Sequence, residues 1–314
     1  MQRFGHISEV PATLRSGAVS IGNFDGVHLG HARIISRLVA RAASLGGPSV
    51  VFTFDPHPAT LLRPDAGIQK LVTADHKLEL LEQLGVDAVI TFPTDRQLLE
   101  LSAGAFFENI VLSGLGAGAI VEGPDFAFGK NREGTIEQLG KLCKEQQIVL
   151  EVVEPVEFNG EVISSSRLRR LVGEGELKTV NQMLTSPFRI RGKIQRGSGR
   201  GEQLGFPTAN LAGVETLLPG DGVYAGCGYI DGQCWPAAVN IGTNPTFDEE
   251  MAKLEVHLVG FSGSRYGEMI DVQLLERLRD VRRFENAVEL QSQIEADVHQ
   301  ACQLAKQVPG MMEE

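Results

Sequence analysis

Two histidines framed by glycines form the densest group of reactive side chains in the first half of the chain. They lie in Gly22-Asn23-Phe24-Asp25-Gly26-Val27-His28-Leu29-Gly30-His31, which follows an apolar run and precedes a helical pattern. Glycines let the backbone approach a phosphate closely, and a helix N-terminus offers free N–H groups to an anion. His28 and His31 can both donate hydrogen bonds to polyphosphate oxygens, which would stabilise charge developing at an attacked phosphorus. The segment predicts a phosphate site; a structural or metal-binding histidine pair is the alternative.

A second group of oxygen ligands lies in Leu204-Gly205-Phe206-Pro207-Thr208-Ala209-Asn210-Leu211. Thr208 contributes a hydroxyl and Asn210 a side-chain amide to this segment. Pro207 makes the loop rigid, although the composition also fits a simple turn. Upstream, Arg196-Gly197-Ser198-Gly199-Arg200-Gly201 is a basic, glycine-rich loop that can wrap a phosphate, without the GK[ST] ending of a Walker loop.

Three further candidates depend on where the chain places them. Glu255 points away from the apolar face formed by its neighbours on an expected strand, towards either a cleft or solvent. Ser164–Ser166 can cap a helix and present hydroxyls to a phosphate. Arg169, one turn further on, can bind a transferring phosphate, although both segments also fit an ordinary cap and a solvated helix face.

The first half of the chain shows apolar strands alternating with helices. A helix is expected over 32–45, closed by Gly46 and Gly47, and similar patterns occupy 73–84 and 98–112. Continuous apolar strands separated by helices predict a parallel sheet covered on both faces. Five strands are expected: 18–24, 49–54, 86–92, 117–122 and 149–153.

The pattern changes near residues 185–187 to short strands with turns between them. Asp231–Gly232 is a hairpin signal between two of these strands. Closely spaced strands without helices between them predict a small antiparallel barrel. Its strands are expected at 188–194, 223–230, 235–241, 254–259 and 270–275, followed by a helix over 287–306. The predicted domains are therefore 1–185 and 186–314.

Composition narrows the class of protein. The chain has 314 residues, 42% of them hydrophobic, which is enough for about two domains. The formal charge of −11 disfavours binding to a nucleic-acid backbone. We expect no membrane span, since no apolar run approaches about 20 residues, and no secretory signal, so a cytoplasmic location is expected. The four cysteines form no CxxC pair and suggest neither zinc binding nor redox work. A homo-oligomer is left open.

The histidine segment resembles the HxGH motif of the nucleotidyltransferase superfamily, and the longer string resembles its flavin branch. Phe52–Pro58 resembles the FxPxP strand end of that branch, and Gly123–Gly129 resembles its flavin- and ATP-contacting loop. Ile163–Arg169 resembles its ISSTxxR segment, with Ser166 where Thr is usual; serine keeps the hydroxyl. The resemblance implies catalytic roles for His28, His31 and Arg169. It implies flavin contacts for Phe54, Pro56, Pro58, Asp125 and Phe128, and nucleotide contacts for Gly22, Asn23, Phe24, Asp25, Gly26, Gly30, Ser164, Ser165 and Ser166.

The second half resembles the riboflavin kinases through their GFPTAN motif at Gly205–Asn210 and their LEVHLL strand at 254–259, where Val259 replaces the last Leu. The resemblance implies that Glu255 is the catalytic base, that Thr208 and Asn210 bind Mg²⁺, and that Arg279 contacts flavin or phosphate. The implied nucleotide contacts are Gly197, Gly201, Gly205, Pro207, Thr208 and Asn210. Glu202 departs from the family, which usually has arginine there, so weaker binding of ATP is expected.

Together the two resemblances cover roughly residues 15–300 and imply a bifunctional riboflavin kinase/FMN adenylyltransferase. The implied fold is an α/β, Rossmann-like nucleotidyltransferase domain with a parallel sheet, followed by a small antiparallel β-barrel kinase domain and a C-terminal helix. The second domain would convert riboflavin and ATP to FMN and ADP, using Mg²⁺, and the first would convert FMN and ATP to FAD and pyrophosphate. The alternatives are an enzyme with one inactive site, a non-catalytic flavin or nucleotide sensor, or a first domain that adenylylates another phosphate ester.

Overall fold

The protein is described here from a computed structural model, which covers residues 1–314 except 63–66, 68, 198, 245–248, 307 and 309–314. The chain divides into two compact units. The first comprises residues 1–68 and 74–164, and the second comprises 69–73 and 165–314. This division falls earlier than the predicted domain limit at 185/186, because the helices α7 (Ser165–Gly173) and α8 (Leu177–Asn181) belong to the second unit.

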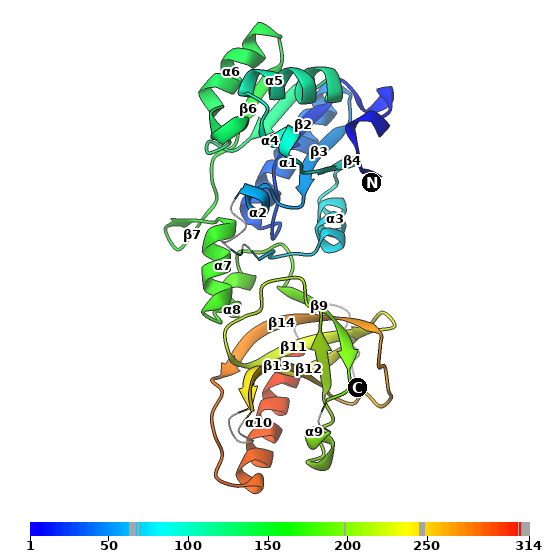
Figure 1. Cartoon of the computed structure of the whole chain (residues 1–314), viewed down its shortest axis with the longest axis vertical. Coiled ribbons are helices and arrows are strands. Elements are labelled where there is room, and N and C mark those ends of the chain that lie inside the picture. The colour runs from blue at the N-terminus through cyan, green and yellow to red at the C-terminus, as the bar shows by residue number, and fades with distance from the viewer. Residues whose placement is uncertain (63–66, 68, 198, 245–248, 307, 309–314) are drawn as a thin grey trace. The chain divides into compact units, whose positions relative to one another are not determined.

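A parallel sheet forms the first unit, as predicted (Figure 1). Among the described residues its strand order is β1-β4-β3-β2-β5-β6, and every neighbouring pair is parallel. The prediction of five strands was one short, because the edge strand β1 is only three residues long and carries no apolar run. The strands are β1 (Gln2–Phe4), β2 (Ala18–Ile21), β3 (Ser49–Asp55), β4 (Ala88–Pro93), β5 (Ala119–Glu122) and β6 (Val149–Val152).

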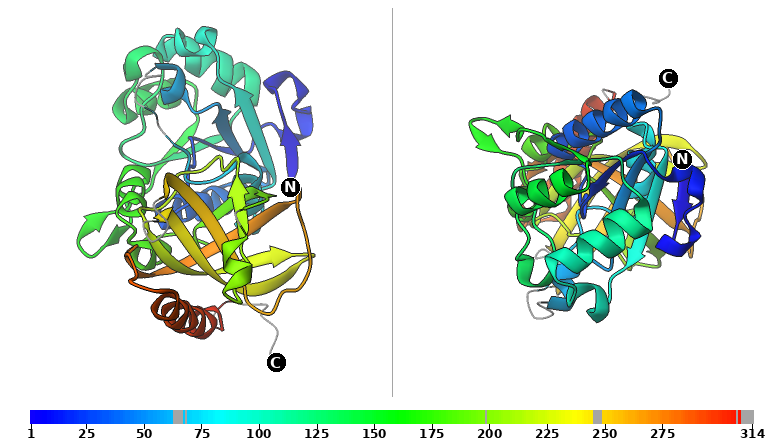
Figure 2. Two further views of the ribbon diagram at one scale, coloured as in Figure 1. Left: turned by 60° about the horizontal axis from the view of Figure 1, so that its bottom comes forward. Right: turned by 90° about the horizontal axis from the view of Figure 1, so that it is seen from above.

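Helices cover both faces of this sheet, with α1 on one side and the helical segment of residues 103–115 on the other (Figure 2). The helix expected over 98–112 is divided, because Ser102 caps a new start within it. The helices are α1 (Leu29–Leu45), α2 (Pro58–Leu62), α3 (Ala74–Gln83), α4 (Arg96–Leu99), α5 (Ala103–Phe106), a π-helix (Phe107–Leu115) and α6 (Ile136–Glu145). Short 3₁₀ turns lie at Ile7–Glu9, Ala12–Leu14 and Lys130–Arg132, and a two-stranded ribbon joins β7 (Glu157–Phe158) to β8 (Glu161–Val162).

The second unit contains a closed antiparallel barrel with the strand order β10-β13-β12-β11-β14-β9 (Figure 2). The strand β10 was not predicted, because the turn-like Pro207 and Asn210 mask a short extended segment. The barrel strands are β9 (Arg189–Gln195), β10 (Ala209–Ala212), β11 (Gly222–Ile230), β12 (Gln233–Asn244), β13 (Glu249–Leu258) and β14 (Met269–Arg279). A short helix, α9 (Arg200–Gln203), precedes β10, and α10 (Ala287–Ala305) confirms the expected C-terminal helix.

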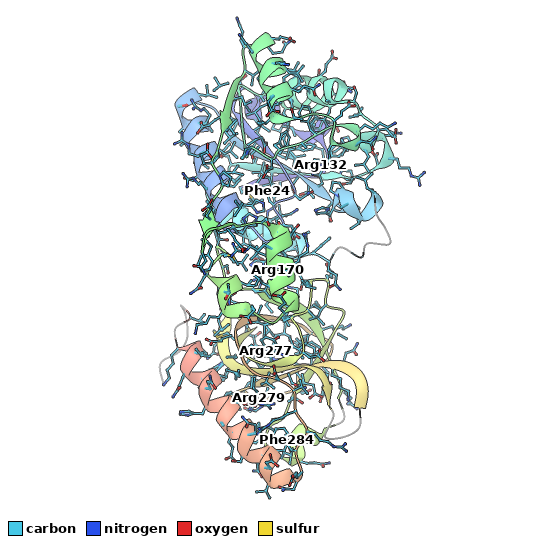
Figure 3. The ribbon with its side chains drawn as sticks, turned by 90° about the vertical axis from the view of Figure 1, so that its left-hand side faces the viewer. Phe24, Arg132, Arg170, Arg277, Arg279 and Phe284 are labelled. Carbon is cyan, nitrogen blue, oxygen red and sulfur yellow. The ribbon has the colours of Figure 1, made fainter. Side chains whose placement is uncertain are left out.

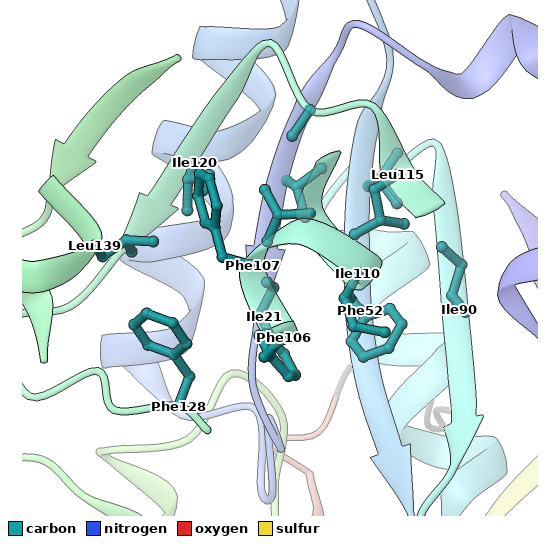
Figure 4. Packing of buried hydrophobic residues seen from close by; sticks show 14 of the residues in the cluster. Ile21, Phe52, Ile90, Phe106, Phe107, Ile110, Leu115, Ile120, Phe128 and Leu139 are labelled. Carbon is teal, nitrogen blue, oxygen red and sulfur yellow. The ribbon is translucent and has the colours of Figure 1, made fainter. Parts of the chain in front are cut away.

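The core of the first unit lies between the sheet and the segment 103–115 (Figure 4). Phe52, from the middle of β3, is fully buried and contacts the rings of Phe54 and Phe92 at centroid distances of 5.3 and 5.5 Å. Phe106 and Phe107 pack on the sheet from the helical side. This apolar layer fixes the strand ends, from which the turns of the first candidate site extend.

Replacing Phe52 with alanine should destabilise the first unit by about 3–5 kcal/mol, because a buried ring is lost and a cavity remains. Urea denaturation followed through the methyl NMR signals of Ile90 and Ile120, both buried in this unit, measures the change. Leu45→Ala is the matched control. Since 42% of Leu45 is exposed, its change should stay within about 0.5 kcal/mol. Equal effects of the two substitutions would contradict the assigned core.

Candidate functional site

A strained turn connects the end of β2 to the start of α1. His28 is the N-cap of α1, and its Nδ1 accepts a hydrogen bond from the backbone N–H of His31 at 3.3 Å. Within the turn, Phe24 and Val27 adopt left-handed conformations with φ of 48° and 40°. Such backbone is costly for a β-branched residue and tends to occur at functional sites. The turn therefore has a defined backbone conformation, and together with the N-terminus of α1 it lies at the predicted phosphate site.

The two histidine rings of this turn lie against each other. The rings of His28 and His31 stack with centroids 3.7 Å apart and planes 17° from parallel, and Phe24 meets His31 edge-on at 5.2 Å. Gly30 makes this possible, because a Cβ there would lie 3.0 Å from the His28 ring. The structure thus brings together the two histidines and the glycine that were predicted as one site.

Burial keeps both rings of the histidine pair neutral near pH 7. Desolvation lowers the pKa of His28 to about 4, and only 5% of His28 is exposed. The pKa of His31 is lowered well below its ordinary value by desolvation first, and then by the charges of His28 and Lys77. A neutral imidazole has one N–H donor and one acceptor nitrogen. The pair can therefore donate hydrogen bonds to phosphate oxygens without a net charge of its own.

A largely apolar cavity of about 460 Å³ opens beside the turn. Six predicted residues line it, namely Gly22, Asn23, Phe54, Pro58, Asp125 and Phe128. Its size lies within the range of small-molecule sites. Because its walls include several aromatic and aliphatic side chains with a few polar groups, the cavity suits a largely apolar ligand that carries some polar groups.

Several residues of this cavity were missed by the sequence analysis. They are His57, Leu62, Leu98, Leu99, Phe106, Asn131 and Arg132. Asn131 and Arg132 sit in a loop closed by mutual backbone hydrogen bonds between Phe128 and Gly134, of 3.0 and 2.9 Å. The flanking Gly129 and Gly134 indicate a loop at Asn131 and Arg132. Loop residues have no periodicity, however, that would predict which cavity they line.

The other predicted residues of the first site have different surroundings. Pro56 follows a cis peptide bond after Asp55 and does not line the described cavity. Ser164 directly precedes α7 and belongs to the first unit, and its capping of that helix stays a prediction. Ser165, Ser166 and Arg169 lie on α7 in the second unit, where Arg169 Nε donates to the carbonyl of Gln69 at 2.9 Å. A joint role of these residues with His28 stays a prediction.

The remaining turn residues, Phe24 and Asp25, are buried, and Gly26 has a φ of 85° that favours glycine. Sequence analysis had placed these residues at the nucleotide, which the structure does not test. It does show that they form the turn itself rather than an exposed loop.

The register of the barrel brings the predicted kinase residues together. Asn210 on β10 is the cross-strand partner of Glu255 on β13, and Asn240 on β12 faces the same glutamate from the other side. Directly opposite residues share one face, with Cβ atoms about 4.5–5.5 Å apart. Leu254 and Val256 are buried in the barrel, so Glu255 points outward, as predicted. The row Asn210–Glu255–Asn240 forms a polar patch on the outer face.

Glycines let the loop before β10 approach this polar row. A Cβ on Gly197 would overlap the side-chain amide of Asn210, and a Cβ on Gly201 would overlap the carbonyl of Phe206 and lie 3.3 Å from Thr208 Oγ1. Gly205 has a φ of 87° and so also requires the freedom of glycine. The basic loop and the oxygen ligands Thr208 and Asn210, predicted separately, are therefore neighbours.

His257 anchors the loop through a contact that sequence analysis did not anticipate. Its Nδ1 lies 2.8 Å from the carbonyl oxygen of Pro207, and its ring meets Phe206 edge-on at 5.5 Å. His257 follows Glu255 by two residues, so both point to the same face of β13. The strand that carries the candidate base also holds the candidate metal-binding loop.

The oxygen ligands in this loop fit a magnesium ion. A threonine hydroxyl, an asparagine carbonyl and the carboxylate of Glu255 are all hard donors. In the part of the chain that the structure describes, no group of three or more His, Cys, Asp or Glu side chains could form a protein-only metal cage. Mg²⁺ usually keeps several waters and also binds substrate phosphates, so it needs few protein ligands.

Arg279 forms contacts with other side chains of the second unit. Its guanidinium pairs with Asp297 of α10 at 2.9 Å and lies 5.5 Å from the centre of the Phe284 ring (Figure 3). Asp297 is 5% exposed, so a charged partner is needed to offset its desolvation. This contact ties α10 to the end of β14, and a flavin contact of Arg279 stays a prediction.

Two family models match the chain in consecutive segments. The FAD synthetase model matches residues 10–167, and the riboflavin kinase model matches residues 184–305. Their order agrees with the order of the two candidate sites.

Curated relatives match over nearly the whole chain. A bifunctional riboflavin kinase/FMN adenylyltransferase of Pseudomonas fluorescens is 37% identical over 93% of this chain and 94% of its own length. The protein of the same name from Haemophilus influenzae is 32% identical over 96% of this chain and 98% of its own length.

One solved structure shares the fold along the chain. The crystal structure of a macrolide-efflux protein from Streptococcus pneumoniae superimposes with a TM-score of 0.86 at 30% identity, covering 96% of this chain and 98% of that one. Among the described residues of the present chain, no helix is long and apolar enough to span a membrane.

Acidification should destabilise the first unit through His28. Because folding lowers the pKa of His28 from 6.5 to about 4, its contribution is complete above pH 6.5 and is lost as the pH falls towards 4. For this group alone the loss amounts to about 2 kcal/mol at pH 5 and to about 3 kcal/mol once the pH is well below 4. Urea denaturation at pH 7.5 and pH 5, read from the Ile21 and Ile120 methyl signals, should show it.

In the variant His28→Gln this pH dependence should become shallower. His299→Gln, changed at an exposed helix position in the other unit, should keep the wild-type dependence in the first unit. A His28→Gln variant with unchanged pH dependence would contradict the burial of a neutral ring.

Proposed function

The chain belongs to the family of bifunctional riboflavin kinases/FMN adenylyltransferases, and on that premise we propose which residues carry out each reaction. The enzyme phosphorylates riboflavin to FMN and adenylylates FMN to FAD, with the adenylyltransferase segment preceding the kinase segment. The observation that supports the kinase assignment best is the pairing of Asn210 with Glu255 across two barrel strands.

In the kinase half, Glu255 accepts the proton of the ribityl 5′-hydroxyl as that oxygen attacks the γ-phosphate of ATP. A carboxylate within hydrogen-bond reach is suited to this task. Thr208 and Asn210 would hold Mg²⁺, which would neutralise charge on the nucleotide phosphates. Gly197, Gly201 and Gly205 let the backbone of the loop approach those phosphates, and His257 keeps the loop at β13 through the Pro207 carbonyl.

In the adenylyltransferase half, a phosphate oxygen of FMN attacks the α-phosphate of ATP, and pyrophosphate leaves. His28 and His31 donate hydrogen bonds to the phosphate oxygens, beside the N-terminus of α1. Such positioned donors stabilise the charge of the transition state. The resemblance also assigns phosphate binding to Ser164–Ser166 and Arg169. The flavin ring occupies the cavity lined by Phe54, Pro58, Asp125 and Phe128.

We also propose a cytoplasmic enzyme that acts on small molecules. The use of ATP supports this location, as do the buried thiols of Cys143, Cys227 and Cys234, which form no disulfide.

Separate substitutions should remove one activity each. Glu255→Gln removes the base but keeps the size of the side chain, so FMN formation from riboflavin should fall about 100-fold or more. His28→Asn should lower FAD formation from FMN about 100-fold or more, because a transition-state donor is lost. Chromatography of riboflavin, FMN and FAD after incubation with ATP and Mg²⁺ measures both. Each variant controls for the other, and loss of both activities from either change would contradict two independent sites.

Glu202→Arg should tighten binding of ATP to the kinase. Glu202 is exposed on α9, next to the basic loop, and a cation there would interact with phosphate charge in place of a carboxylate. The KM for ATP in FMN formation should fall several-fold at low salt, and the difference should shrink as salt is added, since exposed charges are screened. Glu215→Arg makes the same charge change elsewhere in the unit and should leave this KM unchanged.

A further inference from the structure

A buried lysine lies next to the histidine turn. Lys77, on α3, is 8% exposed. Lysine is almost never fully buried unless its ammonium has partners. The position of this charge therefore needs an explanation in terms of the site beside it.

Lys77 joins three parts of the first unit through hydrogen bonds. Its Nζ donates to Thr53 Oγ1 at 3.0 Å and to the backbone carbonyl of Asn23 at 3.2 Å. Thr53 Oγ1 in turn donates to the same carbonyl at 3.3 Å. One ammonium thus connects α3, the end of β3 and the turn that leads to His28.

The turn next to this lysine contains two buried polar atoms that have no hydrogen-bond partner among the described residues. Among the described residues, Asn23 Oδ1 and His31 Nδ1 are buried and have no hydrogen-bond partner in the protein. Buried polar atoms are nearly always satisfied, so such exceptions call for a partner from outside the chain. Both atoms belong to residues of the proposed phosphate site.

We propose that Lys77 is a positioning residue for adenylyl transfer, which fixes the backbone at Asn23 and places a positive charge beside the histidine pair. The proposal rests on the proposed function of this site. Lys77 takes no part in the exchange of bonds: an FMN phosphate oxygen bonds to the α-phosphorus as the bond to the bridging oxygen breaks and pyrophosphate leaves.

The positive charge of Lys77 lowers the pKa of His31, after desolvation and the charge of His28. The titratable groups that act on His31 are His28, at the start of the same helix, and Lys77 on α3. Both lower its pKa, after desolvation, and so favour a neutral ring that presents one N–H donor. Removing the lysine charge should raise the pKa of His31, so that the ring becomes protonated at a higher pH.

The test measures FAD formation from FMN by the full-length variant Lys77→Met. We expect kcat to fall about tenfold to a hundredfold, as for a displaced active-site group. The acid limb of the kcat–pH profile should move to higher pH, and the Kd for FMN should stay at its wild-type value. Lys141→Met, which removes an exposed lysine from α6 in the same unit, should match the wild type in all three.

Lys77→Gln keeps a hydrogen-bond donor for Asn23 without the charge. It should recover part of kcat while retaining the shifted acid limb, so it tests the charge even if Lys77→Met does not fold. FMN formation from riboflavin, measured on the same samples, reports the other half of the enzyme.

An unchanged kcat, or a reduced kcat with the acid limb at its wild-type pH, would overturn the role of Lys77. The proposed function is tested separately by the wild-type protein. If the wild type makes no FAD, the function fails; if it makes FAD and Lys77→Met behaves like Lys141→Met, only the inference about Lys77 fails.

Discussion

Close approach of the backbone to a neighbouring group is the constraint on which both sites depend. In the first unit, Gly30 leaves room for the ring of His28, which lets the histidines stack at the start of α1. In the second, Gly197 lies where any side chain would overlap the amide of Asn210. A phosphate must approach within hydrogen-bond distance of several groups at once, so each loop has to be tight before the ligand arrives. The glycines allow this backbone geometry, and the packed strands next to the loops hold it in place.

The kinase patch is set by strand register. Glu255 lies between Asn210 and Asn240 because β13 pairs with β10 on one side and β12 on the other. A slip of one residue would turn Glu255 into the barrel and expose Leu254 and Val256, which are buried there. The apolar interior therefore specifies the position of the candidate base, although it never touches a substrate. The same apolar packing that fixes the register of β13 also fixes the position of the Glu255 carboxylate.

Sequence patterns predicted the parts of this structure that depend on local or periodic features. The buried β2 and β3, the helix α1 and the change to a barrel follow from apolar spacing, and the two motif-bearing loops follow from glycine and histidine spacing. The edge strand β1 was missed because its three residues carry no apolar pattern. Its extended conformation depends on pairing with β4. Lys77 and Arg132 could not be placed either. Only the tertiary structure shows that one approaches Asn23 and that the other lines the cavity.

The polar groups of the two candidate sites differ in burial: those of the first site are buried, and those of the second lie on the outer face of the barrel. The histidine pair is neutral and desolvated, so its donors become strong in a low-dielectric site without attracting a counter-ion. The ammonium of the nearby Lys77 donates hydrogen bonds to the carbonyl of Asn23 and to the hydroxyl of Thr53. On the barrel, by contrast, the polar row lies on the outer face, where solvent weakens each charge. A net charge of −11 is compatible with both arrangements, because a phosphate responds to the groups within a few ångströms of it.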